Sequence, residues 1–163
     1  MSGVGSNRAP TGEPDVTALG LERFFAPSRV AVVGVGREPS GVGRSVFRNL
    51  ISAGFEGALF PVNPHMTEVE GRTCYPSVSA LPETPDLAVI AVPAAGVPGV
   101  VRDLGVLGTR CAIVISAGFK ETGREGAALE RELLAAAAEH DIRILGPNCL
   151  GLIATPSKLN ASF

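Results

Sequence analysis

The sequence predicts an α/β fold in which helices cover both faces of a doubly wound, mainly parallel sheet. Short apolar, β-branched runs alternate with amphipathic segments along the whole chain. These runs are continuously apolar, as in parallel strands that are buried on both faces. Each run ends in glycine, proline or a small residue, which places the turns at one edge of the sheet.

Size and composition agree with one globular domain. The chain has 163 residues, of which 45% are hydrophobic and 18% charged. A net charge of −2 without a basic run gives no reason to expect nucleic acid or an anionic membrane as a partner. No apolar stretch approaches the ~20 residues that cross a bilayer, and no secretion signal begins the chain, so we expect a cytoplasmic protein.

The chain offers few metal-binding or disulfide-forming side chains. Three well-separated cysteines indicate neither a disulfide framework nor a zinc site, and we expect each to be a small buried residue. Two histidines are too few for a metal cluster. These residues are Cys74, Cys111, Cys149, His65 and His140.

The first 25 residues predict a tail and a short helix. Residues 1–18 are rich in Gly, Ser, Pro and Thr, which is typical of a flexible tail. Residues 19–25 follow as a short amphipathic helix, and Pro27 ends it. Phe24 and Phe25 are expected to pack over the first strand.

Apolar runs predict the strands, and apolar stripes predict the helices between them. The helix at 43–53 carries Val46, Phe47, Leu50 and Ile51 on one face, and Gly54 follows it where a positive φ is common. Further helices are expected at 97–107, with Pro98 in the first turn, and at 124–140. The expected strands are 30–35, 58–62, 87–92, 111–115, 142–145 and a short sixth at 149–153.

Ligands of open parallel sheets bind at the carboxyl ends of the strands. Here those ends carry a glycine-rich loop at 34–43 and short turns that begin at 62, 92, 116 and 146. Turn glycines let a backbone approach a ligand closely, and the helix after the loop offers free N–H groups. The loop therefore predicts a site for a phosphate-bearing ligand, with a ligand-free tight turn as the alternative.

The loop matches a dinucleotide site only in part. Gly34 and Gly36 occupy the first two positions of the Gly-x-Gly-x-x-Gly pattern, but Pro39 stands at the third. The second strand ends at 61–64 without the acidic residue that holds the adenosine ribose. NAD is therefore the weaker alternative.

Six segments together resemble a known family. They lie at 25–34, 39–43, 61–64, 91–94, 115–119 and 146–151. In order and spacing they resemble the CoA-binding domain of ADP-forming acyl-CoA synthetases, which is similar to the α subunit of succinyl-CoA synthetase. The resemblance implies a Rossmann-like domain at 19–155 that binds CoA or acyl-CoA, and a linker at 156–163 that leads to a missing domain.

The resemblance also implies which residues contact CoA. The loop and helix start at 34–43 would hold the phosphates, and 62–64 would lie beside adenine and ribose. Residues 92–94 would form an apolar wall for the adenine or the pantetheine. The stretch 116–118 would lie beside the pantetheine arm, and Asn148 near the thioester end. The predicted CoA-binding residues are Gly34, Gly36, Arg37, Ser40, Gly41, Val42, Gly43, Val62, Asn63, Pro64, His65, Val92, Pro93, Ala94, Ser116, Ala117, Gly118 and Asn148.

The basic contact to the ribose phosphate departs from the family pattern. The family often has a lysine just after the second strand, where this chain has His65-Met66. An imidazole is neutral much of the time near pH 7. Arg37 and Arg44 are alternative phosphate partners, and His65 as a solvated loop residue is the other interpretation.

The resemblance implies a ligase domain that is inactive alone. Family enzymes form acyl-CoA with ATP through a phosphohistidine in a downstream domain, and neither His65 nor His140 matches that position. Expected partners are CoA and the downstream domains or subunit of a synthetase, with a homo-oligomer also possible. The alternatives are an acyl-CoA-sensing module of a protein lysine acetyltransferase and a free-standing CoA-binding protein.

Overall fold

The computed structural model describes residues 20–163, so the tail predicted at 1–18 lies outside the described residues. Five parallel strands form the main sheet. The predicted doubly wound, Rossmann-like α/β fold is therefore confirmed. In spatial order the strands are β2 (Ala58–Val62), β1 (Arg29–Val33), β5 (Leu87–Ile90), β6 (Cys111–Val114) and β7 (Arg143–Leu145).

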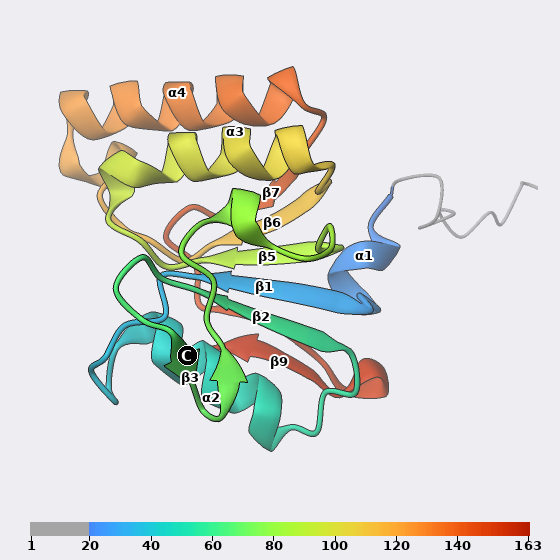
Figure 1. Cartoon of the computed structure of the whole chain (residues 1–163). Helices are drawn as coiled ribbons and strands as arrows, with labels where there is room; N and C mark the ends of the chain where they lie inside the picture. The colour runs from blue at the N-terminus through green and yellow to red at the C-terminus, as the bar shows by residue number, and fades with distance from the viewer. Residues whose placement is uncertain (1–19) are drawn as a thin grey trace, which may run out of the picture.

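Helices cover both faces of this sheet (Figure 1). α3 (Val97–Leu107) and α4 (Arg124–Glu139) lie together on one face, and α2 (Val42–Ser52) lies on the other. Successive side chains of β1 belong to different cores, with Val32 on the α2 side and Val33 on the side of α3 and α4. Both faces of the strands are thus buried, which explains their continuously apolar sequences.

Short elements complete the chain. They are α1 (Glu22–Phe25), the hairpin of β3 (Glu68–Val69) and β4 (Arg72–Thr73), and the 3-10 turns η1 (Val78–Ala80), η2 (Ala94–Gly96), η3 (Lys120–Thr122) and η4 (Thr155–Ser157).

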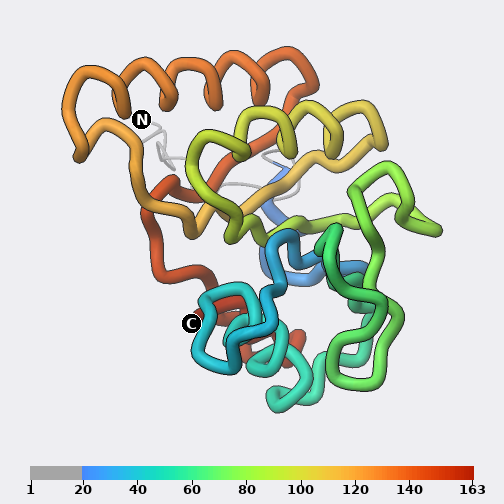
Figure 2. Tube along the Cα trace, turned by 60° about the vertical axis from the view of Figure 1, so that its left-hand side comes forward, coloured from blue at the N-terminus to red at the C-terminus, as the bar shows by residue number. Residues whose placement is uncertain are grey.

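The C-terminal segment differs from its prediction. The sixth strand is β8 (Gly151–Ala154), which pairs antiparallel with β9 (Leu159–Ser162) in a separate hairpin rather than joining the main sheet. The segment 156–163, expected as a linker, thus contains a strand at 159–162. Alternate β9 side chains are buried in the α2 core, and the Asn49 side chain of α2 donates to the Ser162 carbonyl at 2.9 Å. Figure 2 shows the chain returning beside the loop that precedes α2.

Element boundaries shift by one or two residues from the predicted ones. The strands predicted at 30–35, 87–92 and 111–115 end earlier, because their last residues already turn into the loops. α2 begins at Val42, and α3 has the predicted bounds. The helix predicted at 19–25 is confined to α1, where Phe24 is buried but Phe25 is 49% exposed and does not belong to the core.

The strand order creates a crevice between β1 and β5. The chain passes from β1 through α2 to β2 on one side, and then crosses to β5 on the other side of β1. At such a switch point the two loops that leave neighbouring strands diverge to opposite faces and leave room for a ligand. The glycine-rich loop after β1 borders this crevice.

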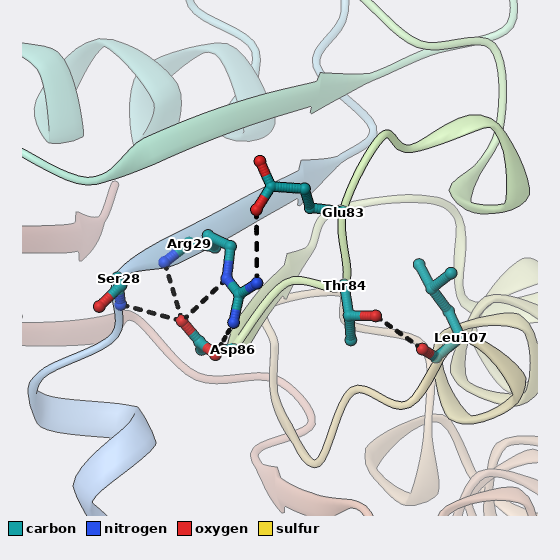
Figure 3. Close-up of polar contacts among 6 residues, drawn as sticks. All are labelled: Ser28, Arg29, Glu83, Thr84, Asp86 and Leu107. Carbon is teal, nitrogen blue, oxygen red and sulfur yellow. Dashed lines mark hydrogen bonds and ion pairs between the residues drawn. The ribbon is translucent and has the colours of Figure 1, made fainter.

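An ionic cluster joins β1 and β5 at the opposite, amino end of the sheet (Figure 3). The Asp86 carboxylate accepts bonds from the backbone N–H groups of Ser28 and Arg29, both at 3.0 Å, and from the Arg29 guanidinium at 3.0 Å. Burial opposes the charge of Asp86, but these bonds outweigh it and hold the pKa of that carboxyl below its usual value. Thr84 and Glu83 extend the cluster, since Thr84 donates to the Leu107 carbonyl and Glu83 pairs with Arg29.

Replacing Asp86 by asparagine is expected to lower the free energy of unfolding by about 2 kcal/mol near neutral pH. Because the folded-state pKa of Asp86 is lowered, its contribution is complete above pH ~4 and is lost as the pH falls below that value. Denaturant unfolding at neutral pH and at about pH 3 measures both effects. Glu83→Gln, at an exposed position, is the control, with a change below about 0.5 kcal/mol. A deficit of Asp86→Asn that stayed equal at both pH values would contradict this account.

Candidate ligand groove at the carboxyl ends of the strands

Three hollows lie side by side where the parallel strands end. We name them after the elements that border them. The β2 hollow, of about 440 Å³, is lined by Val33, Gly34, Val62, Asn63, Pro64, Pro76, Ser77, Val78, Ala91, Val92, Pro93, Val100 and Asp103. The β6 hollow, of about 380 Å³, is lined by Val42, Ala91, Val92, Pro93, Ile115, Ser116, Ala117, Asn148 and Phe163. The His65 hollow, of about 220 Å³, is lined by Arg37, His65, Met66, Thr67 and Glu68.

The hollows form a groove along the crevice. The β2 and β6 hollows share the segment 91–93 after β5, so this segment lies between them. The β2 hollow ends at Pro64 and the next residue, His65, lines the third hollow. A further apolar hollow, between α1 and β7, shares no lining residue with these three.

Close packing accounts for two glycines of the loop after β1. A Cβ on Gly43 would come closer than 3.0 Å to the backbone of Gly34, a distance that real side chains essentially never show. Gly34 has a φ of +100°, and a Cβ there would meet the Ala91 carbonyl at 2.7 Å. These glycines let α2, β1 and the end of β5 meet directly. Gly36 differs, because a Cβ there would meet nothing within 4 Å.

The start of α2 presents unpaired backbone donors towards the loop. Gly41 is the N-cap and provides no side-chain cap, and the first helical bond runs from the Ser45 N–H to the Gly41 carbonyl. Among the described residues, no acceptor is found for the N–H groups of residues 42–44. Together with the helix dipole, they make this end of α2 favourable for an anion.

The basic side chains near the loop have different surroundings. Arg44 lies half-buried in an ion pair with Glu70 at 2.8 Å, and Arg48 pairs with the same carboxylate at 3.4 Å. Arg37 is exposed and donates to the His65 backbone carbonyl at 3.3 Å. Within residues 20–163, Arg37 has no carboxylate partner. Of the two predicted phosphate partners, Arg37 is therefore the available one.

Two predicted contact residues use their side chains to hold the loops together. The Asn63 amide donates to the Val35 carbonyl at 3.0 Å, and its oxygen accepts the His65 N–H at 2.8 Å. The Ser116 hydroxyl donates to the Val92 carbonyl at 2.6 Å. These bonds connect β1 to β2 and β5 to β6 at the groove, so both side chains shape it as well as line it.

A carboxylate fixes the turn that follows β6. Glu121 accepts bonds from the backbone N–H groups of Gly118 at 2.6 Å and Phe119 at 3.1 Å. These bonds, with one from its own N–H, hold the pKa of the Glu121 carboxyl below its usual value. Phe119 is fully buried, which secures the turn beside the groove.

The prediction that all three cysteines are buried is confirmed for two of them. Cys74 and Cys111 are buried, and burial raises the pKa of the Cys111 thiol to about 11. Cys149 is only half-buried and donates to the Val114 carbonyl at 3.4 Å. In the part of the chain that the structure describes, no group of three or more metal-ligating side chains occurs, and no helix is long and apolar enough to cross a membrane.

The structure brings most of the predicted site residues together. Twelve of them line the three hollows, namely Gly34, Arg37, Val42, Val62, Asn63, Pro64, His65, Val92, Pro93, Ser116, Ala117 and Asn148. The others lie in the neighbouring loops or at the start of α2 or η2 without lining a hollow, namely Gly36, Ser40, Gly41, Gly43, Ala94 and Gly118.

Sequence reasoning missed the contribution of α3 and of the segment after β4. Val100 and Asp103 of α3 line the β2 hollow, as do Pro76 and Ser77. Val100 and Asp103 are three residues apart and therefore lie on the same side of the helix. This spacing is the sequence pattern that could have indicated that they line one hollow together. Phe163 lines the β6 hollow because β9 folds back along α2.

Comparison with known proteins identifies the family. A family model described as a CoA binding domain matches residues 28–155. The chain is 47% identical over 143 residues to ADP-forming acetate–CoA ligase I of Archaeoglobus fulgidus, covering 88% of this chain and 21% of the relative. It is 43% identical to the α subunit of the Pyrococcus furiosus enzyme I, covering 89% of this chain and 32% of the relative.

A solved structure extends the likeness to the fold. Acetyl-coenzyme A synthetase 1 of Candidatus Korarchaeum cryptofilum, in complex with phosphate and ADP, matches with a TM-score of 0.83 at 46% identity. The match covers 87% of this chain and 30% of that one, so the chain spans about a fifth to a third of the length of these relatives. The chain therefore belongs to the CoA-binding domain family, and it is homologous to the N-terminal or α-subunit part of ADP-forming acyl-CoA synthetases.

Proposed function

We propose that the groove binds CoA in an extended conformation along the carboxyl ends of the strands. The adenosine occupies the β2 hollow and the pyrophosphate lies at the loop 34–41 and the start of α2. The pantetheine arm occupies the β6 hollow, and the ribose 3′-phosphate lies at the His65 hollow. The observation that carries this assignment is the pair of hollows on either side of 91–93, with the α2 N-terminus bordering the second.

The chemistry of each hollow fits the assigned part of CoA. No charged residue lines the β6 hollow, which suits the uncharged pantetheine arm. Prolines and valines dominate the walls of the β2 hollow, and such flat apolar surfaces suit a purine ring. The free N–H groups of α2 and the Arg37 guanidinium suit phosphates. His65 lines the same hollow as Arg37 and stays a candidate for the ribose-phosphate contact that the family resemblance assigns to a lysine.

We further propose that this domain presents CoA to the rest of an ADP-forming acyl-CoA synthetase. The relatives named above are acetate–CoA ligases, and a 4-hydroxybutyrate–CoA ligase of Nitrosopumilus maritimus is 34% identical. All of them are several times longer than the matched segment. In this proposal the remaining parts activate the acid with ATP, and the CoA thiol meets the activated acyl group near Asn148. A cytoplasmic location and a homo-oligomer stay predictions.

Gly36→Asp is expected to weaken CoA binding by about tenfold or more, because it places a negative charge beside the pyrophosphate. The position suits the test, since a Cβ there meets nothing within 4 Å, whereas a substitution of Gly43 would disturb packing. Gly36→Ala separates the effect of bulk from that of charge, and Gly99→Asp on α3, where a Cβ also meets nothing, is the matched control. Calorimetric titration with CoA and NAD provides the measurement. Unchanged CoA affinity in folded Gly36→Asp would move the pyrophosphate elsewhere, and binding of NAD without CoA would reject the proposed function.

Arg37→Ala is expected to weaken CoA binding about fivefold to tenfold and to leave the binding of 3′-dephospho-CoA nearly unchanged. Only CoA carries the phosphate that the guanidinium would pair with, and an exposed charge-assisted bond contributes about 1 kcal/mol. Titrations of both ligands against the wild type and the variant isolate this pair. Arg131→Ala, an exposed arginine of α4, serves as the control. An equal loss for both ligands would assign Arg37 to the pyrophosphate instead.

A further inference from the structure

Asp103 is the one charged residue that lines the β2 hollow. Asp103 lies on α3, and Val97, Val101 and Leu104 on the buried face of that helix pack into the core. Asp103 and Val100 of α3 line the same hollow as the segment 91–93 after β5. Within residues 20–163, Asp103 makes no ion pair, while the adjacent Arg102 pairs with Glu139 at 3.9 Å. The carboxylate is therefore available to a ligand.

The other residues of the hollow leave few polar partners for a ligand. Most of its walls are valine, proline, alanine and glycine. The Asn63 side chain is committed to the loops at both its nitrogen and its oxygen, and the Ser77 hydroxyl bonds with the Ser79 hydroxyl at 2.9 Å. A carboxylate accepts hydrogen bonds and donates none at neutral pH. A ligand that fills this hollow thus meets apolar walls and one strong acceptor.

We propose that Asp103 is a specificity-determining residue that recognises adenine by accepting a hydrogen bond from its exocyclic amine. This inference rests on the proposed placement of adenosine in the β2 hollow. Adenine presents flat apolar faces and an amine donor at one edge, which match the walls and the acceptor. A base with a carbonyl oxygen in place of the amine would bring this oxygen against the Asp103 carboxylate, and both groups are acceptors. A site built to hydrogen-bond one ligand group discriminates strongly against a ligand that lacks it.

The same charge sets the direction of CoA in the groove. A carboxylate repels phosphate, so the β2 hollow disfavours the pyrophosphate and the ribose phosphate. The groups that favour phosphates are the N–H groups at the start of α2 and the Arg37 guanidinium, which shares its hollow with Glu68. A CoA molecule bound in the reverse sense would place the pantetheine arm in the β2 hollow and adenine in the β6 hollow. The amine would then lose its acceptor, since no charged residue lines the β6 hollow. The loss of this hydrogen bond favours the proposed direction.

The test compares CoA with deamino-CoA, in which hypoxanthine replaces adenine and an oxygen replaces the exocyclic amine. The wild-type chain is expected to bind CoA about fivefold to tenfold more tightly than deamino-CoA, because Asp103 is exposed and an exposed charge-assisted bond contributes about 1 kcal/mol. In Asp103→Ala the two affinities become equal within about twofold, mainly through weaker CoA binding. In Asp103→Asn the amide can donate to the hypoxanthine oxygen, so deamino-CoA binds more tightly than it does to the wild type.

Controls separate this inference from the proposed function. Glu132→Ala removes an exposed carboxylate of α4 that lines none of the three hollows, and it should keep the wild-type preference. Circular dichroism confirms that each variant is folded. Asp103 does not recognise the base if the wild type binds CoA and deamino-CoA equally, or if Asp103→Ala still prefers CoA over deamino-CoA. Either result leaves the proposed CoA-binding function in place. If the wild type binds neither ligand, the proposed function itself is rejected, and the inference with it.

Discussion

The contact between Gly34 and Gly43 is the constraint on which the groove depends. The backbone at the end of β1 and the backbone at the start of α2 touch directly, and a side chain on Gly43 would push them apart. A side chain on Gly34 would instead collide with the Ala91 backbone after β5. This contact fixes the direction in which α2 leaves the sheet. It therefore fixes where the free N–H groups of α2 lie relative to the loops after β2 and β5. A phosphate site made of backbone donors needs such rigidity, because a main chain cannot adjust as a long side chain can.

Hydrogen bonds between loops extend this rigidity along the groove. Asn63 joins the loops after β1 and β2, Ser116 joins the ends of β5 and β6, and Glu121 closes the turn that follows. These polar groups satisfy one another within the protein, so the groove keeps its shape without a ligand. A preformed groove loses less conformational entropy on binding than one that must be ordered by its ligand.

The sequence predicted the fold well because strand and helix patterns are local. Continuous apolar runs at β1 and β5 and the stripe of α2 are visible without knowledge of the neighbours. β9 was missed, because Leu159 and Ala161 alternate over too few residues to distinguish a strand from a linker. Most predicted site residues came from the strand ends, where topology alone places ligands. Asp103 was not found in this way, since it reaches the site from the middle of α3, and only the packing of α3 beside β5 brings it there.

The distribution of charge along the groove explains how a small domain can distinguish the two ends of a long ligand. Arg37 lines the His65 hollow together with Glu68, Asp103 lines the β2 hollow, and no charged residue lines the β6 hollow, which the start of α2 borders. Each stretch favours a different part of CoA, namely phosphate, amine-bearing base or neutral pantetheine. Because the three parts occur in CoA in a fixed order, the three preferences reinforce one another in only one binding direction. In the proposed binding mode, that direction carries the thiol towards Ser116 and Asn148, at the opposite end of the groove from the base.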